Sequence, residues 1–166
     1  MALSAIETHL IKEEHLYKDL VAVLQTETEN LVSRDFRALY ETVGRKEHIL
    51  KRIELSGAER LRLVRDAAGK LGLKPGPKGE FALSEIIERS GPPADALESK
   101  RNIIISLIDS IRELNHLNGL IVKGSLDNIN KTLGFLGNFL QTGVYGQKGA
   151  FDGFASVKGS HLSEGA

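Results

Sequence analysis

The sequence predicts an all-α protein: an elongated antiparallel bundle of three long helices with a short helical insert and a flexible C-terminal tail. Leucine and isoleucine recur every seven residues along three long segments, as they do on helices that pack side by side. Trp is absent and Phe and Tyr number only 6 and 3, so strand-favouring aromatic residues are scarce. Pro and Gly gather at a few places, where helices must end.

The first long helix is expected over residues 3–31. Its apolar row repeats every seven residues and consists of Leu3, Leu10, Tyr17, Leu24 and Leu31. Ile6 and Leu20 occupy the companion row. Glu13 and Glu27 interrupt that companion row. Because about thirty helical residues extend about 45 Å, this element is predicted to be rod-like.

A second long helix is expected from Ser33, whose hydroxyl can accept hydrogen bonds from the first free amides. Its predicted apolar row is Phe36, Leu39, Val43, Leu50, Ile53, Leu61, Val64 and Leu71. The helix must end before the loop at residues 72–80, because Pro75 and Pro77 lack amide donors and clash with a preceding turn.

A short helical insert is expected at residues 84–89, ended by Gly91-Pro92-Pro93. The third long segment is the most hydrophobic, and its heptad row is Leu97, Ile104 and Ile111. That row continues onto Asn118, a polar residue where an apolar one is expected. An Asn at such a position often fixes the register of packed helices at some cost in stability.

Glycine becomes frequent after Asn118, although helical spacing of apolar residues persists. We call this set the C-terminal stripe, and its members are Leu126, Ile129, Leu133, Leu136, Phe139 and Leu140. Glycine weakens a helix, so this part is expected to be a marginal extension of the third helix. The predicted division is a helical bundle over residues 1–142 and a flexible, glycine-rich tail over residues 143–166.

Composition excludes several classes of function. Lys plus Arg and Asp plus Glu both number 22, so no net charge favours nucleic acid or an anionic membrane. The chain has no Cys, which excludes disulfides, thiolate metal sites and cysteine nucleophiles. No apolar run is long enough for a signal peptide or a membrane span, so we expect no membrane insertion and a cytoplasmic location.

Candidate residues for chemistry are few. Glu113 and His116 form one Glu-x-x-His motif, whereas a di-iron bundle needs two. His9 and Glu13 stand four residues apart and are expected to be an exposed pair on one helix. The sequence contains neither a phosphate-binding Walker motif nor a nucleophile elbow. We therefore expect no catalytic residue, no metal and no cofactor, and a protein that is not an enzyme.

Several segments, taken in order, resemble the FlgN-type chaperones of the bacterial flagellar export system. The resemblance extends over about residues 3–150. It rests on Glu14, Tyr17 and Leu20 before Glu27, on Leu39 through Arg45-Lys46-Glu47 to Leu61, on the stretch from Leu114 to Ile121, and on Tyr145 with Gly149. The stretch from Leu114 contains Asn115 and Asn118, spaced like the paired Asn residues of that family, and both are assigned as register or core polar residues.

This resemblance implies a cytoplasmic chaperone for type III protein export in flagellum assembly. Such a chaperone binds the hook-associated proteins of the hook–filament junction, prevents their premature association and delivers them to the flagellar export gate. The C-terminal stripe would hold the C-terminal helical segment of the cargo. Tyr145 would dock to the export gate.

Two alternatives remain open at this point. The first is a self-associating structural or scaffolding helical bundle that pairs through the same stripe. The second is a bundle enzyme or metal protein that uses Glu113 and His116. Tyr145, Phe151 and Phe154 of the tail likewise admit two readings, because an aromatic tail can bind a partner or pack back on its own bundle.

Overall fold

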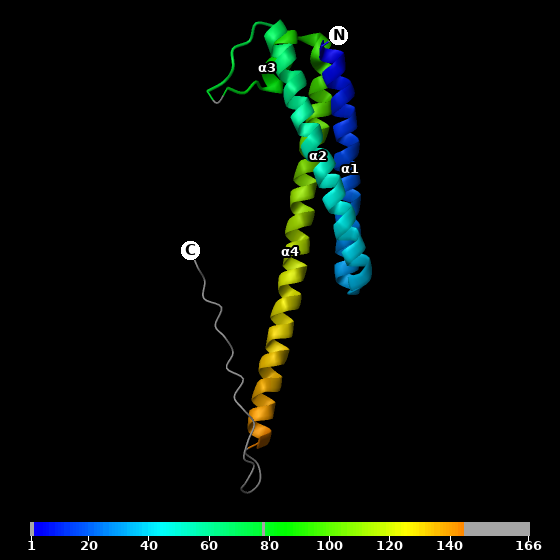
Figure 1. The fold of residues 1–166 in the computed structure, drawn as a ribbon, viewed down its shortest axis with the longest axis vertical. Helices are drawn as coiled ribbons and strands as arrows, with labels where there is room; N and C mark the ends of the chain where they lie inside the picture. The colour runs from blue at the N-terminus through cyan, green and yellow to red at the C-terminus, as the bar shows by residue number, and fades with distance from the viewer. Residues whose placement is uncertain (1, 78, 145–166) are drawn as a thin grey trace. The chain divides into compact units, whose positions relative to one another are not determined.

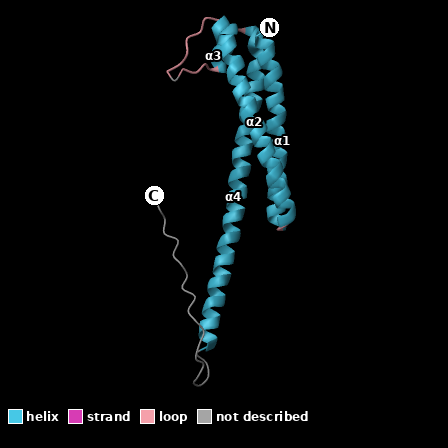
Figure 2. Cartoon of the chain, viewed as in Figure 1, coloured by secondary structure: helices cyan, strands magenta, loops and turns pink. Residues whose placement is uncertain are grey.

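The computed structural model describes residues 2–77 and 79–144, with side chains for all of these except Ala2, Pro93 and residues 138–144. The described part contains helices and loops but no strand. Its elements are α1 (Ala2–Ser33), α2 (Phe36–Lys70), α3 (Leu83–Ser90), the 3₁₀ helix η1 (Pro92–Ala94) and α4 (Asp95–Val144) (Figures 1 and 2). The prediction of an all-α fold with three long helices and a short helical insert is therefore confirmed.

The chain divides into two compact units, Met1–Leu126 and Asp127–Ala166. The first unit holds α1, α2, α3 and the beginning of α4, and the second holds the rest of α4. The predicted division at residue 142 stays a prediction. α4 includes Gly143 and Val144, and residues 145–166 lie outside the described part.

Within the first unit, side-chain contacts fix the directions of the long helices. These contacts join Glu13 to Arg60, Glu27 to Lys46, Glu14 to Lys100 and Glu27 to Asn118. From Glu13 to Glu27 of α1, the contacting residues of α2 fall from 60 to 46, so these two helices are antiparallel. From Glu14 to Glu27, the contacting residues of α4 rise from 100 to 118, so α4 runs parallel to α1 and antiparallel to α2 (Figure 1).

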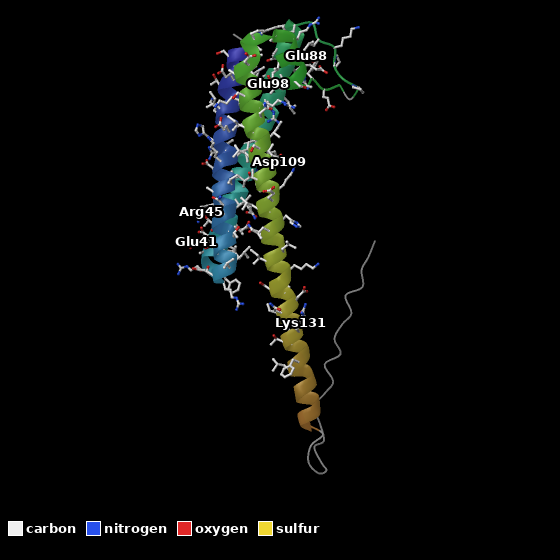
Figure 3. All side chains as sticks on the ribbon, turned by 180° about the vertical axis from the view of Figure 1, so that it is seen from behind. Glu41, Arg45, Glu88, Glu98, Asp109 and Lys131 are labelled. Atoms are coloured by element: carbon white, nitrogen blue, oxygen red, sulfur yellow. The ribbon has the colours of Figure 1, made fainter. Side chains whose placement is uncertain are left out.

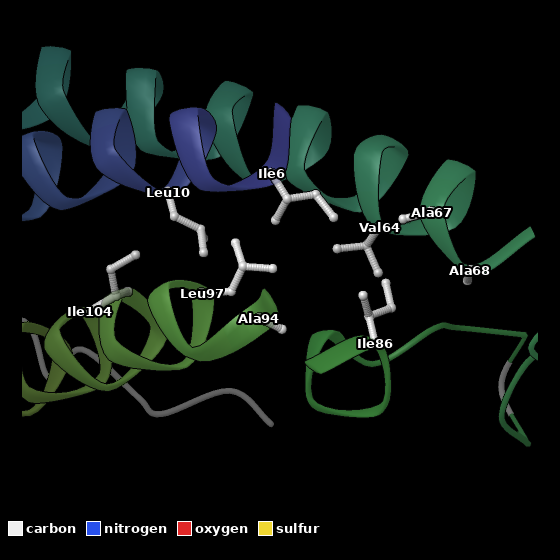
Figure 4. Packing of buried hydrophobic residues seen from close by; sticks show 9 residues of the cluster. All are labelled: Ile6, Leu10, Val64, Ala67, Ala68, Ile86, Ala94, Leu97 and Ile104. Atoms are coloured by element: carbon white, nitrogen blue, oxygen red, sulfur yellow. The ribbon is translucent and has the colours of Figure 1, made fainter. Parts of the chain in front are cut away.

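Two apolar clusters hold this unit together. The larger consists of Ile6, Leu10, Val64, Ala67, Ala68, Ile86, Ala94, Leu97 and Ile104, contributed by all four helices and η1 (Figure 4). The smaller consists of Leu20, Leu24, Ile49 and Ile111, where α1, α2 and α4 meet. The short helix α3 enters the larger cluster through Ile86, which is fully buried. The insert therefore covers one end of the core.

The heptad row predicted for α4 is confirmed by burial. Leu97, Ile104 and Ile111 are 1%, 5% and 9% exposed, and Asn118 continues the row at 5%. The row predicted for α2 is wrong for half of its members: Val64 is buried and Leu39, Val43 and Ile53 are half-buried, but Phe36, Leu50, Leu61 and Leu71 are exposed. The buried face of α2 consists of Thr42, Ile49, Val64, Ala67 and Ala68. Three of these five are small or polar residues that a count of large apolar side chains overlooks.

The turn between α1 and α2 differs in detail from the prediction. Ser33 ends α1 and does not cap α2. Asp35 is the N-cap of α2, and its carboxylate accepts a hydrogen bond of 3.0 Å from the Ala38 amide. Arg34 links the two helices with a φ of 59°, and the Asp35 amide donates to the Asn30 carbonyl at 3.0 Å. This is a C-terminal helix motif in which glycine normally takes the left-handed position.

Replacing Arg34 with Gly is expected to stabilise the fold by about 0.5–1 kcal/mol, because glycine reaches positive φ without the clash of a Cβ atom. The corresponding position at the end of α2 is Gly72, whose φ is 65°. Urea unfolding followed by circular dichroism would measure the change. Arg37→Gly, within the first turn of α2, is the control and should destabilise the protein. Equal effects of the two variants would contradict the prediction.

Candidate partner-binding site

The side chains of the C-terminal stripe are exposed wherever the structure describes them. Leu126, Ile129, Leu133 and Leu136 are 55%, 55%, 60% and 48% exposed. Spacings of three and four residues put such side chains on one side of a helix. The side chains of Phe139 and Leu140, also assigned to the stripe, lie outside the described part. Tyr145, assigned to gate docking, lies outside it as well.

Helix α4 begins with residues that favour a helix and continues with residues that weaken one. Asp95 and Glu98 lie in its first turn, where negative charge complements the helix dipole. Farther along, the helix contains Gly124, Gly134 and Gly137, and a Cβ added at any of them would meet nothing within 4 Å beyond its own helical turns. Each such glycine costs about 1 kcal/mol relative to Ala, with no close packing in return. Contacts with a partner would strengthen this part of the helix.

The structure places the two Asn residues differently. Asn118 is buried, and its amide donates to the Leu24 carbonyl at 3.2 Å and to Glu27 Oε2 at 2.9 Å. The Thr28 hydroxyl donates to Asn118 Oδ1 at 2.6 Å. Asn115 is exposed, so it does not share this core position. Of the two, only Asn118 lies where it can fix the register of α4 against α1.

Three carboxylates of α1 are buried, which their sequence context did not predict. Glu13, Glu14 and Glu27 are only 1%, 7% and 6% exposed. Each is paired with a cation from another helix: Glu13 with Arg60, Glu14 with Lys100 and Glu27 with Lys46. The available signal was the position of Glu13 and Glu27 in the companion apolar row. A charge at a core position implies a buried partner.

Glu14 is bound by the ammonium groups of two lysines. Its two oxygens accept hydrogen bonds from Lys100 Nζ at 2.8 Å and Lys18 Nζ at 2.6 Å. These contacts, with Lys100 contributing most, lower the pKa of Glu14 from 4.5 to about 2. The carboxylate is thus held in its charged form in the folded protein at all ordinary pH values.

Glu14→Gln is therefore expected to destabilise the protein at pH 7 by about 1.5–3 kcal/mol, the range for hydrogen bonds to charged groups. The folded-state pKa lies below the unfolded value, so this stabilisation is complete above pH 4.5 and is lost as pH falls toward 2. Urea unfolding of both proteins between pH 7 and pH 2.5 would measure it. A difference in stability that does not shrink on acidification would contradict the assignment.

The candidate metal residues do not come together. Glu113 and His116 are both exposed on α4. His9 Nε2 lies 3.8 Å from Glu13 Oε1, but the two side chains are 12% and 1% exposed, so the expectation of an exposed pair is wrong. Glu13 is instead bound by Arg60 at 2.7 Å. Among the described residues, no three His, Asp or Glu side chains are placed to share a metal ion.

Charged residues of both signs are interleaved on the described surface. Glu41 and Arg45 project from α2, Glu88 from α3, and Glu98 and Asp109 from α4 (Figure 3). Such a mixture is typical of solvated helix faces and differs from the basic patch that nucleic acid requires. No helix in residues 2–77 or 79–144 is long and apolar enough to cross a bilayer.

The described part of the chain is a helical bundle with a row of exposed apolar side chains on α4, a kind of surface that partner-binding helical proteins use. A family model described as "FlgN protein" matches residues 1–152. The chain belongs to the FlgN family, which confirms the resemblance seen in the sequence. This family consists of flagellar export chaperones that bind hook-associated proteins, and it is not known for enzymes. Comparisons with curated proteins and with solved structures gave no match.

Proposed function

We propose that this chain is a cytoplasmic chaperone that binds the C-terminal helical segments of hook-associated proteins on its C-terminal stripe. It then delivers them to the flagellar export gate. The single observation that supports this site is the exposure of Leu126, Ile129, Leu133 and Leu136 on one helix, each close to half or more. Exposed apolar rows of this kind mark interaction sites on soluble proteins.

The chemistry of the stripe favours an amphipathic helix as its partner. Apolar anchors three and four residues apart match the spacing of a second helix lying alongside. Residues between Leu126 and Leu133 other than Ile129 are polar or charged, among them Asp127, Asn128, Asn130 and Lys131. The apolar surface offered to the partner is thus narrow there and becomes wider at Phe135, which is 70% exposed. Fully burying an exposed aliphatic side chain contributes about 1.5–3 kcal/mol, so half-exposed ones contribute about 1 kcal/mol each.

Removing the stripe tests this assignment. A chain that ends at Ser125 keeps every residue of both apolar clusters. We expect it to retain cooperative unfolding and to lose measurable binding to hook-associated proteins in titration calorimetry. Unchanged affinity in the shortened chain would refute the site. Gate docking is tested by Tyr145→Ala, which should reduce the export of cargo by cells while cargo affinity stays unaltered. Undiminished export would contradict gate docking.

Self-association is the alternative that the same exposed side chains favour. A scaffolding protein would cover the stripe with a second copy of itself, which size-exclusion chromatography with light scattering detects as a tight oligomer. A chaperone would elute as a monomer at the same concentration and form a complex only when cargo is added. An oligomer that hook-associated proteins fail to dissociate would favour the scaffold.

A further inference from the structure

The most exposed apolar side chains of the unit Met1–Leu126 gather where α1 turns into α2. Val32, Phe36 and Tyr40 are 69%, 74% and 83% exposed, more than any other large apolar side chain described in that unit. We call these three residues the tip surface. Phe36 and Tyr40 stand four residues apart on α2, so they share one side of that helix. The cargo site described above includes none of them.

The tip surface lies at about the level where the C-terminal stripe begins. Glu27 accepts hydrogen bonds from Lys46 of α2 and from Asn118 of α4, so these two residues mark one level of the unit. Because α2 and α4 are antiparallel, Phe36 and Leu126 both lie beyond that level in the same direction. At a rise of about 1.5 Å per residue, Phe36 lies about 15 Å and Leu126 about 12 Å farther along. The turn between α1 and α2 is therefore close in level to the first residue of the stripe.

The size of the tip surface shows what kind of partner it can bind. A buried Phe or Tyr side chain removes about 150–250 Å² from water, so these three partly covered side chains offer roughly 400 Å². A stable interface between two proteins buries about 800 Å² on each partner. The tip surface is thus too small to hold a second copy of this chain by itself. A partner that already covers Leu126 at the same level gains this area in addition.

We propose that the tip surface is a second part of the cargo-binding site, where it contacts the end of the cargo helix that lies along α4. This inference rests on the proposed function, which places that helix on the C-terminal stripe. α1 ends at Ser33 and α2 begins at Phe36, so a helix that covers Leu126 and extends back along α4 meets the turn between them. Apolar side chains in the terminal turn of the cargo helix would cover Val32, Phe36 and Tyr40.

The test is the double variant Phe36→Gln with Tyr40→Gln in the full chain. Its matched control is Leu55→Gln with Leu61→Gln, which changes two side chains of α2 that are 64% and 57% exposed and lie toward its other end. Titration calorimetry with a hook-associated protein should show about tenfold weaker binding for the tip variant and less than about threefold change for the control. All four positions face solvent, so circular dichroism should show that both variants fold.

Contact with the tip surface is measured directly by alkylation of a cysteine introduced as Val32→Cys, in a chain that has no other Cys. Labelling should become severalfold slower when a hook-associated protein is bound. A cysteine introduced as Leu55→Cys is the control and should label at the same rate in both states.

Unchanged cargo affinity in the tip variant, or an unchanged labelling rate at position 32 in the complex, would overturn this inference. The C-terminal stripe would then remain the whole site, provided that Gln at Ile129, Leu133 and Leu136 still weakens binding. If the original chain shows no affinity for hook-associated proteins, or if Gln at those three positions leaves the affinity unchanged, the proposed function fails and this inference fails with it.

Discussion

Replacing Ile129, Leu133 and Leu136 together with Gln is expected to weaken binding of hook-associated proteins by about 100-fold. Each side chain is about half exposed and would contribute about 1 kcal/mol on burial, so three of them contribute about 3 kcal/mol. Gln is a good helix former, so the helix itself should persist. Titration calorimetry would give the affinity, and circular dichroism would give the helix content.

The matched control is Asn128→Gln with Asn130→Gln on the same stretch of α4. These positions lie between the apolar anchors and are already polar, so cargo affinity should change by less than threefold. Equal losses in the two variants would mean that the whole segment matters and not its apolar side. Undiminished affinity in the triple variant would place the binding site elsewhere in the chain.

Arg60→Met is expected to destabilise the protein by about 3 kcal/mol, although Arg60 is not a member of either apolar cluster. Glu13 is 1% exposed, and Arg60 Nη1 binds its Oε2 atom at 2.7 Å. Within the described part of the chain, the other oxygen of Glu13 has no hydrogen-bond partner. Removing one partner of a buried ion pair leaves a charge without compensation, which typically costs 3–5 kcal/mol. The lower end applies because the Arg60 side chain is itself 32% exposed.

The double variant Glu13→Leu with Arg60→Met isolates the electrostatic part of this effect. Glu13 occupies the companion row of Ile6 and Leu20, so a leucine there would join the apolar core. We expect the double variant to regain most of the stability lost in Arg60→Met, as measured by urea unfolding. If the stability lost in the double variant equalled the sum of the losses in Glu13→Leu and Arg60→Met measured separately, the buried charge would not be the cause.

The sequence predicted those features that depend on large apolar residues at regular spacing. The heptad row ending at Asn118 and the short insert at residues 84–89 are present in the structure, although the insert is slightly longer. The buried face of α2 was assigned only in part, for a physical reason. Thr42 and Ala68 are 0% exposed because close helix packing favours small side chains, and Thr42 also accepts a hydrogen bond from Asn30. Such positions carry no hydrophobic signal.

The candidate site was predictable only as a pattern. Spacing alone identified the row from Leu126 to Leu136, but the same spacing further back in α4 belongs to buried residues such as Ile104 and Ile111. What separates the two is whether another helix covers them, a property of the fold that no local pattern contains. The ion pairs of Glu13, Glu14 and Glu27 were missed for the same reason, since their partners lie 19 to 86 residues away.

The most direct test of the central claim is the alkylation rate of a single cysteine introduced as Leu133→Cys, in a chain that has no other Cys. We expect rapid labelling in the isolated protein and labelling at least tenfold slower when a hook-associated protein is bound. A cysteine placed as Glu54→Cys, on the exposed surface of α2, should label at the same rate in both states. Slow labelling at position 133 without any cargo, or an unchanged rate in the complex, would show that the C-terminal stripe is not an exposed cargo-binding surface.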